Sequence, residues 1–336
     1  MPPLLEIEDL SVDFRSPLRT VHALNQVSMT VNEGEVIGIV GESGCGKSTL
    51  AYSIMKLLPQ PPAFTSGHIR FSGEDIVELS EKRMRSIRGN DISIVFQDPM
   101  SSLNPGLKVG DQIGEPLRIH KDDSGRKRNG TKLEGKEVKG KVIEVLHRVQ
   151  MPNPDTVYNC YPYELSGGMR QRAAIATALI NEPKVLIADE PTSSLDVTIQ
   201  AQIIRLFSTL KRKIKTTLIL ITHDLGVAAS ICDRIAVMYA GNLMEVGSVD
   251  DIFHSPAHPY TTGLLKATPR AGNKMLQPIP GDVPNLIALN KGCPFQPRCL
   301  YSKEICSEVR PTSRPMASTG GQPHYSYCHF ADTISN

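Results

Sequence analysis

A glycine-rich stretch near the N-terminus has the residue types and spacing of a phosphate-binding loop. The sequence GESGCGKST, residues 41–49, fits the pattern G-x-x-x-x-G-K-[ST] and follows the apolar run EVIGIV. Glycines let the backbone wrap a phosphate chain, so that N–H groups point inward at the N-terminus of the following helix. Lys47 would reach the β- and γ-phosphates, and the Ser48 hydroxyl would hold Mg²⁺. The predicted nucleotide-binding residues of the loop are Gly41, Glu42, Ser43, Gly44, Cys45, Gly46, Lys47, Ser48 and Thr49.

Two adjacent acids close a second apolar run, VLIADE, residues 185–190. The apolar residues are typical of a buried strand, which would deliver Asp189 at its C-terminal end, suited to orienting Mg²⁺ through water. Glu190 would polarise the attacking water or accept its proton. Two acids at a strand end could simply meet solvent, but next to a phosphate loop they indicate catalysis.

A further anion-binding feature lies between these two motifs. The sequence ELSGGMRQR, residues 164–172, places Ser166, Gly167 and Gly168 just before a long helical pattern. A helix N-terminus with exposed N–H groups and a hydroxyl attracts anions. One nucleotide does not need two such cradles on one chain, so the second cradle calls for another explanation.

Alternating strands and helices must position these motifs. LLEIEDLSVDF and ALNQVSMTVN alternate apolar and polar residues as half-buried strands do, and the later strand KVLIADE is followed by a helical pattern from residue 199 and the strand TTLILITHD. This order predicts a largely parallel α/β sheet. The charged stretch at 121–141 predicts a solvated loop leading into a helix. Beyond about residue 255 prolines, glycines and cysteines accumulate, which predicts a compact, loop-rich appendage.

Composition excludes several classes of protein. The 336 residues are 40% apolar and 21% charged with a net charge of +2, so the overall balance calls for no nucleic acid partner. No run of about 18 apolar residues occurs that could span a membrane. The acidic N-terminal sequence MPPLLEIEDLSVDF is unlike a secretory signal, so we expect a cytosolic protein, in which cysteines favour metal binding over disulfides.

Taken together, the motifs resemble those of an ATP-binding cassette, whose LSGGQ-type signature binds the γ-phosphate on the opposite subunit. Met169 replaces the usual glutamine here, while the serine and both glycines are kept. The resemblance implies further parts: Gln97 in ISIVFQDP as a Mg²⁺ ligand, a D-loop at residues 193–196 whose Asp196 acts in trans, and His223 as the switch histidine in LILITHD. Phe14 is the candidate for stacking on adenine.

Other motifs narrow the resemblance to the ATP-binding subunits of bacterial dipeptide, oligopeptide and nickel-peptide ABC importers. These motifs are FQDPMSSLNP (96–105), HPYTTGLL (258–265), IPGDVPNL (279–286) and GCPFQPRC (292–299). The fold class implied is α/β: an ABC-type P-loop ATPase core with a RecA-like mixed sheet flanked by helices, N-terminal antiparallel strands and an inserted helical subdomain at about 100–180. The nucleotide-binding domain would span 1–257, and a small loop-rich extension would span 258–336.

The extension ends in four cysteines: Cys293, Cys299, Cys306 and Cys328. Members of the resembled family bind a [4Fe–4S] cluster there, and thiolates are the usual ligands of such clusters. The spacing itself matches neither a zinc ribbon nor a ferredoxin run, so Zn²⁺, with His324 replacing one ligand, and four unliganded thiols remain alternatives.

The resemblance also implies the mechanism and the partners. Two cassettes, often two paralogues, would enclose each ATP between one phosphate loop and the partner's Ser166, Gly167, Gly168 and Asp196. Glu190 would act as general base, with His223 and Lys47 as the other catalytic residues. The closing and opening of the cassette pair would be passed to two membrane permeases, and a separate substrate-binding protein would select the cargo. The resemblance therefore places this chain at the cytoplasmic face of the membrane.

Other functions remain open at this level. Nickel chelates are the alternative cargo within the family. A non-transport ABC ATPase of nucleic-acid repair is the alternative class, but repair members insert coiled coils or zinc modules where this chain has only about 120 residues between phosphate loop and signature.

Overall fold

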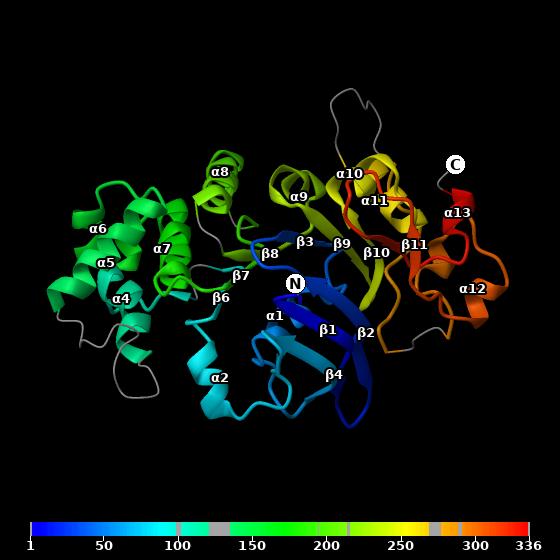
Figure 1. Ribbon diagram of the computed structural model, residues 1–336, viewed down its shortest axis with the longest axis horizontal. Helices are drawn as coiled ribbons and strands as arrows, with labels where there is room; N and C mark the ends of the chain where they lie inside the picture. Colours follow the sequence, from blue (N-terminus) through cyan, green and yellow to red (C-terminus); the bar gives the residue numbers. More distant parts are fainter. Residues whose placement is uncertain are drawn as a thin grey trace. The chain divides into compact units, whose positions relative to one another are not determined.

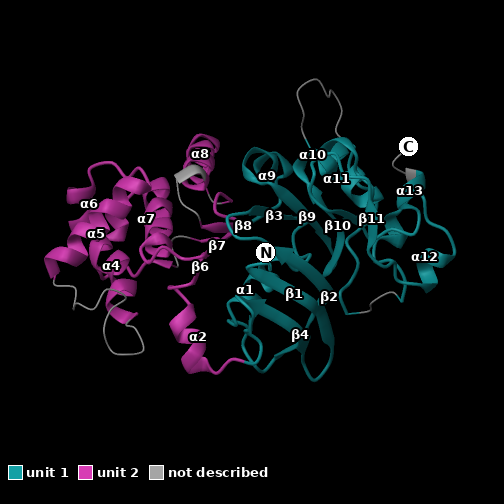
Figure 2. Ribbon diagram, in the orientation of Figure 1, with its two compact units in different colours: residues 1–78, 220–336 teal, residues 79–219 magenta. Residues whose placement is uncertain are grey.

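The structure, a computed structural model, consists of two compact units. Unit 1 contains residues 1–78 and 220–336, and unit 2 contains residues 79–219 (Figure 2). The boundary expected between 257 and 258 lies inside unit 1 and stays a prediction. The structure describes residues 2–98, 102–120, 135–193, 195–213, 216–268, 277–287 and 291–334. Part of the FQDPMSSLNP motif (99–101), most of the charged stretch (121–134) and Ser194 of the D-loop lie outside the described residues.

The first sheet of unit 1 is antiparallel, as the resemblance to ATP-binding cassettes implied. It contains β1 (Leu5–Arg15), β2 (Thr20–Val31), β4 (Ala63–Phe71) and β5 (Glu74–Asp75) in the order β2-β1-β4-β5 (Figure 1). Strand β1 alternates buried and partly exposed residues, which is the pattern of a strand with one covered face.

The second sheet of unit 1 carries the phosphate loop on one of its strands. Its order is β11 (Arg314–Met316), β12 (His324–Ser326), β10 (Asn242–Ser248), β9 (Arg234–Tyr239) and β3 (Val36–Val40). Strands β3 and β9 are parallel and fully buried, as expected for strands with both faces covered. The remaining pairs, β9–β10, β10–β12 and β11–β12, are antiparallel, so the sheet is mixed.

Short helices complete unit 1, and none of the described helices is long and apolar enough to cross a membrane. The chain enters the unit through β8 (Thr217–Thr222), which begins in unit 2. The helices are α1 (Lys47–Ile54), α9 (Leu225–Ile231), α10 (Val249–His254), α11 (Pro259–Ala267), the 3₁₀ turn η2 (Gln296–Arg298), α12 (Ile305–Glu308) and α13 (Ala331–Ile334).

Unit 2 combines a parallel strand pair with a group of helices. Strand β6 (Ile92–Val95) pairs in parallel with β7 (Val185–Asp189). The helices are α2 (Glu81–Ile87), α4 (Val109–Ile119), α5 (Gly135–Arg148), α6 (Pro154–Asn159), the 3₁₀ turn η1 (Pro162–Glu164), α7 (Gly167–Leu179) and α8 (Val197–Lys213). Helices α4 to α7 pack against one another. The helical subdomain expected at about 100–180 stays a prediction.

The C-terminal extension continues the second sheet of unit 1. Strand β12 pairs with β10 through Glu245↔Ser326 and Val246↔Tyr325, and the Tyr327 N–H donates to the Met244 carbonyl at 2.8 Å. The sequence predicted a loop-rich appendage, and these two strands of three residues each are too short to give a periodic signal. The extension therefore shares backbone hydrogen bonds with the cassette's own sheet.

A buried carboxylate also ties the extension to this unit. Asp251, in the first turn of α10, is fully buried and accepts hydrogen bonds from Ser248, Ser318 and Thr319. Burial alone would raise the pKa of Asp251, but the hydrogen bonds from these three residues outweigh it and hold the pKa well below its usual range. The folded state thus favours the charged form of this side chain.

We predict that Asp251→Asn lowers the free energy of unfolding at pH 7 by about 2–3 kcal/mol, since it replaces a buried, hydrogen-bonded charge. A carboxylate with a depressed folded-state pKa contributes stability above its unfolded pKa of about 3.9, and this contribution is lost as the pH falls below that value. Urea unfolding at pH 7 and at about pH 2.5, below the unfolded pKa, would therefore show a smaller pH dependence for the variant. Asp250→Asn, on the exposed side of the same helical turn, is the control. Equal losses in both variants would contradict the prediction.

Candidate functional site

The phosphate loop connects β3 to α1, and glycine is required at two of its positions. Gly46 has a φ of 103°, and a Cβ there would meet the Ala23 carbonyl oxygen at 2.5 Å. A Cβ on Gly41 would meet the Met238 carbonyl oxygen at 2.1 Å. The loop therefore lies directly on the backbone beneath it, while Ser43 and Gly44 at its crest are exposed. Any other residue at either position would push the loop outward.

Lys47 is anchored within the same loop. Its ammonium donates to the carbonyl oxygens of Gly41 at 2.8 Å and Glu42 at 3.0 Å, and it lies 3.8 Å from the Cys45 sulfur. Burial raises the pKa of the Cys45 thiol, although the charge of Lys47 opposes this effect, so the thiol is neutral at pH 7. The Lys47 ammonium is therefore a cation held by backbone groups of the loop, as phosphate binding requires.

Unit 2 brings the predicted general base and the predicted glutamine together. Asp189 is fully buried at the end of β7, and Glu190, the next residue, is partly exposed with a φ of 44°. The Gln97 side-chain amide donates to a Glu190 carboxylate oxygen at 3.1 Å. A positive φ at a glutamate is an uncommon backbone conformation, which proteins retain mostly where function requires it.

Hydrogen bonds hold the first and last residues of the D-loop, Ser193 and Asp196. Ser193 donates from its N–H and its hydroxyl to the Glu190 carbonyl oxygen, at 3.2 and 3.1 Å. A carboxylate oxygen of Asp196 accepts the Ile199 N–H at 3.0 Å, which caps the start of α8. Ser193, the first residue of the D-loop, is therefore linked directly to the backbone of Glu190.

The signature motif forms the N-terminus of α7, as predicted. Ser166 is the N-cap, and its hydroxyl accepts the Met169 N–H at 3.4 Å. Ser166 and Gly167 are exposed, whereas Gly168 is buried and a Cβ there would meet Ile199 at 2.7 Å. The exposed end of a thirteen-residue helix can bind an anion through its free N–H groups and its dipole.

The remaining predicted nucleotide contacts lie in unit 1. His223 is exposed immediately after β8, and Asp224 beside it caps α9. Phe14 is partly buried near the end of β1, where it pairs with Val21 and Ala63. Their roles toward a nucleotide stay predictions.

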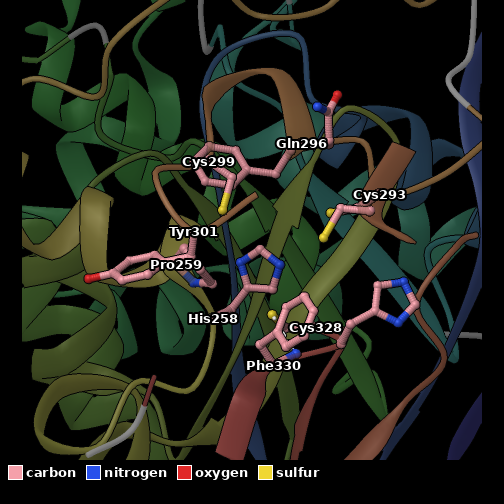
Figure 3. Close-up of a pocket in the computed structure, with 11 residues that line it drawn as sticks. His258, Pro259, Cys293, Gln296, Cys299, Tyr301, Cys328 and Phe330 are labelled. Atoms are coloured by element: carbon pink, nitrogen blue, oxygen red, sulfur yellow. Dashed lines mark hydrogen bonds between the residues drawn. The ribbon is translucent and has the colours of Figure 1, made fainter. Parts of the chain in front are cut away.

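All four cysteines of the extension line one pocket of unit 1. In Figure 3 the sulfurs of Cys293, Cys299 and Cys328 point toward a common space beside the ring of His258. The backbone holds this arrangement through the Cys293 N–H, which donates to the Cys306 carbonyl oxygen at 2.8 Å, and the Phe330 N–H, which donates to the Cys328 sulfur at 3.4 Å. Gly292, next to Cys293, leaves no room for a Cβ against the Cys306 carbonyl.

The pocket is apolar, and burial raises the pKa of three of its thiols, those of Cys293, Cys299 and Cys328. Burial is the main reason that the pKa of Cys293 rises to about 12 and that of Cys328 to about 11, and neighbouring cysteines act in the same direction. Complete burial lowers the pKa of His258 to about 3, so its ring is neutral. The His258 Nδ1 accepts the Tyr260 N–H, and the Tyr327 backbone also interacts with the ring.

The expected metal site is not seen in the structure. Within the described ranges, no three or more His, Cys, Asp or Glu side chains form a group that could hold a metal ion as they stand. His324, the expected alternative ligand for zinc, does not line the pocket: its Nε2 bonds to the buried Glu245 carboxylate at 2.8 Å. The His324 ring therefore links β12 to β10 through its bond to Glu245.

Sequence reasoning missed two residues that contact the phosphate loop. Arg298 bonds to the carboxylate of Glu42, and the Tyr260 hydroxyl accepts the Glu42 N–H at 3.1 Å. Both residues lie in motifs that the sequence shares with peptide importers, HPYTTGLL and GCPFQPRC. That resemblance was the only available signal, since neither residue is close to the loop in sequence.

Comparison with known proteins agrees with this geometry. Residues 24–193 match the model of the ABC transporter family, and residues 244–306 match the C-terminal region of oligopeptide/dipeptide transporters. The oligopeptide transport ATP-binding protein OppD of Salmonella typhimurium is 49% identical over 92% of this chain and 89% of its own length. The dipeptide transport ATP-binding protein DppD of Bacillus subtilis is 49% identical over 93% and 91%.

Solved structures show the same fold. The ATP-binding cassette MJ0796, in a dimeric post-hydrolysis state bound to ADP and Pi, is 27% identical and covers 73% of this chain and 98% of its own, with a TM-score of 0.63. The cbiO1 protein of Clostridium perfringens, part of an ABC transporter complex, is 30% identical over 75% and 91%, with a TM-score of 0.60. The chain belongs to the ABC transporter family as an ATP-binding cassette, and it carries the C-terminal region of the oligopeptide/dipeptide transporters.

Proposed function

We propose that this chain is the ATP-hydrolysing subunit of an importer of dipeptides or oligopeptides. The observation that carries the proposal is the joining of a complete cassette to the oligopeptide/dipeptide C-terminal region in one chain, at 49% identity to OppD and DppD over nearly the whole length. The nickel-chelate alternative differs only in cargo. The relatives named above transport peptides, which favours the peptide assignment.

The catalytic roles follow from the chemistry of the two units. In unit 2 Glu190 would accept the proton of the attacking water, and Gln97, bonded to Glu190 at 3.1 Å, would orient that carboxylate. In unit 1 Lys47 would exchange its loop carbonyls for the β- and γ-phosphates, and His223 would hold the γ-phosphate. Ser48, Gln97 and Asp189 would hold Mg²⁺, which neutralises charge on the phosphates when bound.

A second cassette is the proposed partner, because the phosphate loop and the signature each supply one anion cradle. Ser166, Gly167, Gly168 and Asp196 would contact the nucleotide held by the partner's phosphate loop. The post-hydrolysis MJ0796 cassette is a dimer, which supports this arrangement. ATP would then hold two subunits closed, and hydrolysis would release them, so that membrane permeases receive the motion. The chain would be peripheral at the cytoplasmic membrane face, with cargo chosen by a substrate-binding protein.

The cysteine pocket is proposed to hold a [4Fe–4S] cluster. Four thiols in one apolar pocket match the donor set of such clusters, and the Phe330 N–H already bonds to the Cys328 sulfur. Neutral His258 lines the pocket wall beside the cysteines. When bound, the cluster would cross-link a segment that has little regular structure of its own. Zinc is the alternative occupant.

We predict that Glu190→Gln leaves ATP binding within about twofold and reduces turnover by about 10²–10⁴-fold, since the carboxylate acts after binding. ATP affinity and steady-state hydrolysis of the assembled transporter would be measured. Glu182→Gln, an exposed glutamate of the same unit, serves as the control. Retained turnover in the Glu190 variant would rule out its role as general base.

We predict that Ser166→Asp prevents ATP-driven association of cassettes while preserving the fold. Aspartate is as good an N-cap as serine, so α7 keeps its cap, but a carboxylate there repels a γ-phosphate. Size-exclusion chromatography in the Glu190→Gln background, with and without ATP, measures association. The control is Ser80→Asp, because Ser80 caps α2 in the same way. Association unaffected by Ser166→Asp would argue against the role of the signature in trans.

We predict that anaerobically purified protein contains about four iron and four acid-labile sulfide per chain, with broad absorption near 400 nm, as a cysteine-ligated cluster requires. Cys306→Ser should reduce both contents, whereas Cys160→Ser, in unit 2, should not. Stoichiometric zinc without colour would replace the cluster by a zinc site, and protein without metal would refute both.

A further inference from the structure

Glu42, the second residue of the phosphate loop, is held at three points. Its N–H donates to the Tyr260 hydroxyl at 3.1 Å, and its carbonyl oxygen accepts from the Lys47 ammonium at 3.0 Å. Its carboxylate receives both ends of the Arg298 guanidinium, at 2.8 and 3.2 Å. Two of these three partners, Tyr260 and Arg298, belong to the C-terminal extension. Glu42 is thus the point where the extension meets the loop.

Arg298 is itself fixed on every side. Its side chain is 4% exposed, and besides Glu42 it donates to the carbonyl oxygens of Pro280 at 2.9 Å and Ile279 at 3.3 Å, and to the Tyr239 hydroxyl at 3.3 Å. A buried guanidinium with all its donors engaged holds one orientation, and its paired N–H groups match a carboxylate in two-point contact. Its position is therefore set by the extension and transmitted to Glu42.

Aromatic packing around Tyr260 supports its contact with Glu42. Tyr260 is fully buried, and its ring lies 4.7 Å from the ring of Tyr239 and 5.3 Å from that of Phe295. Burial raises the pKa of the Tyr260 hydroxyl far above its usual range, so it stays protonated. The neutral hydroxyl accepts the Glu42 N–H, which directs that N–H toward the extension.

Electrostatics gives this contact a consequence for nucleotide binding. A carboxylate in the second position of a phosphate loop would repel the phosphates of a nucleotide. Arg298 neutralises the carboxylate and turns it toward the extension. The same pairing fixes the Glu42 peptide, whose carbonyl oxygen bonds to Lys47.

We propose that Arg298 is a positioning residue for the phosphate loop: through Glu42 it sets the placement of Lys47 and thereby the affinity for ATP. This inference rests on the proposed binding of ATP by residues 41–49. Arg298 closes the turn η2, directly before Cys299, and the Cys299 N–H donates to the Gln296 carbonyl oxygen at 3.2 Å. Adjacent residues at the end of η2 therefore contact both sites: Arg298 bonds to the phosphate loop, and Cys299 lines the cysteine pocket.

The test is the affinity of the purified chain for a fluorescent ATP analogue, with KM and kcat for the assembled transporter. Arg298→Ala should weaken binding and raise KM by about tenfold, within the usual range of coupling between sites, and leave kcat within about twofold. Arg298→Lys should recover part of the affinity, since it restores the charge without the two-point contact. In a Glu42→Gln background, Arg298→Ala should have little further effect, because its partner charge is already gone.

Controls separate positioning from a general loss of structure. Lys291→Ala removes an exposed cation of the same extension and should leave affinity unchanged. Metal content and thermal unfolding without nucleotide are measured for each variant. Unchanged affinity in Arg298→Ala, or equal losses with and without Glu42, would overturn the inference. Failure of the unsubstituted chain to bind the analogue would instead refute the proposed nucleotide site.

Discussion

The close contact between the phosphate loop and the backbone beneath it is the constraint on which the rest of unit 1 depends. A loop that binds phosphate must leave most of its N–H groups available to the phosphates, so it depends on support from the surrounding structure. Here Gly41 and Gly46 let the loop lie against the carbonyls of Met238 and Ala23. Met238 belongs to β9 and Ala23 to β2, so the loop lies against a strand of each of the two sheets of the unit.

The extension adds a second support to the same loop. Buried polar pairs, rather than apolar area alone, determine where it attaches: His324 bonds to Glu245, and Arg298 bonds to Glu42. A neighbouring carboxylate raises the pKa of His324, although burial opposes this, so the ring favours its charged form beside Glu245. Buried charges are tolerated only where a partner is supplied, which makes such pairs specific to one docking position.

The two units divide the chemistry between them. Unit 1 holds the phosphate loop and the cysteine pocket, while unit 2 holds the acids at the end of β7 and the signature at the start of α7. Within unit 2 Gly168 of the signature packs against Ile199 of α8, and the Ser193 hydroxyl donates to the Glu190 carbonyl oxygen.

The sequence alone determined the cassette, its phosphate loop, its acids and its signature, because each motif depends on residues adjacent in the chain. Strand–loop–helix context and glycine spacing are local properties. Only the tertiary structure showed that Glu42 faces Arg298, 256 residues further along the chain, that His324 bonds to Glu245 instead of lining the cysteine pocket, and that the extension adds strands to the sheet. The physical reason is that side chains distant in sequence are paired by packing, and three-residue strands carry no periodicity from which packing could be inferred.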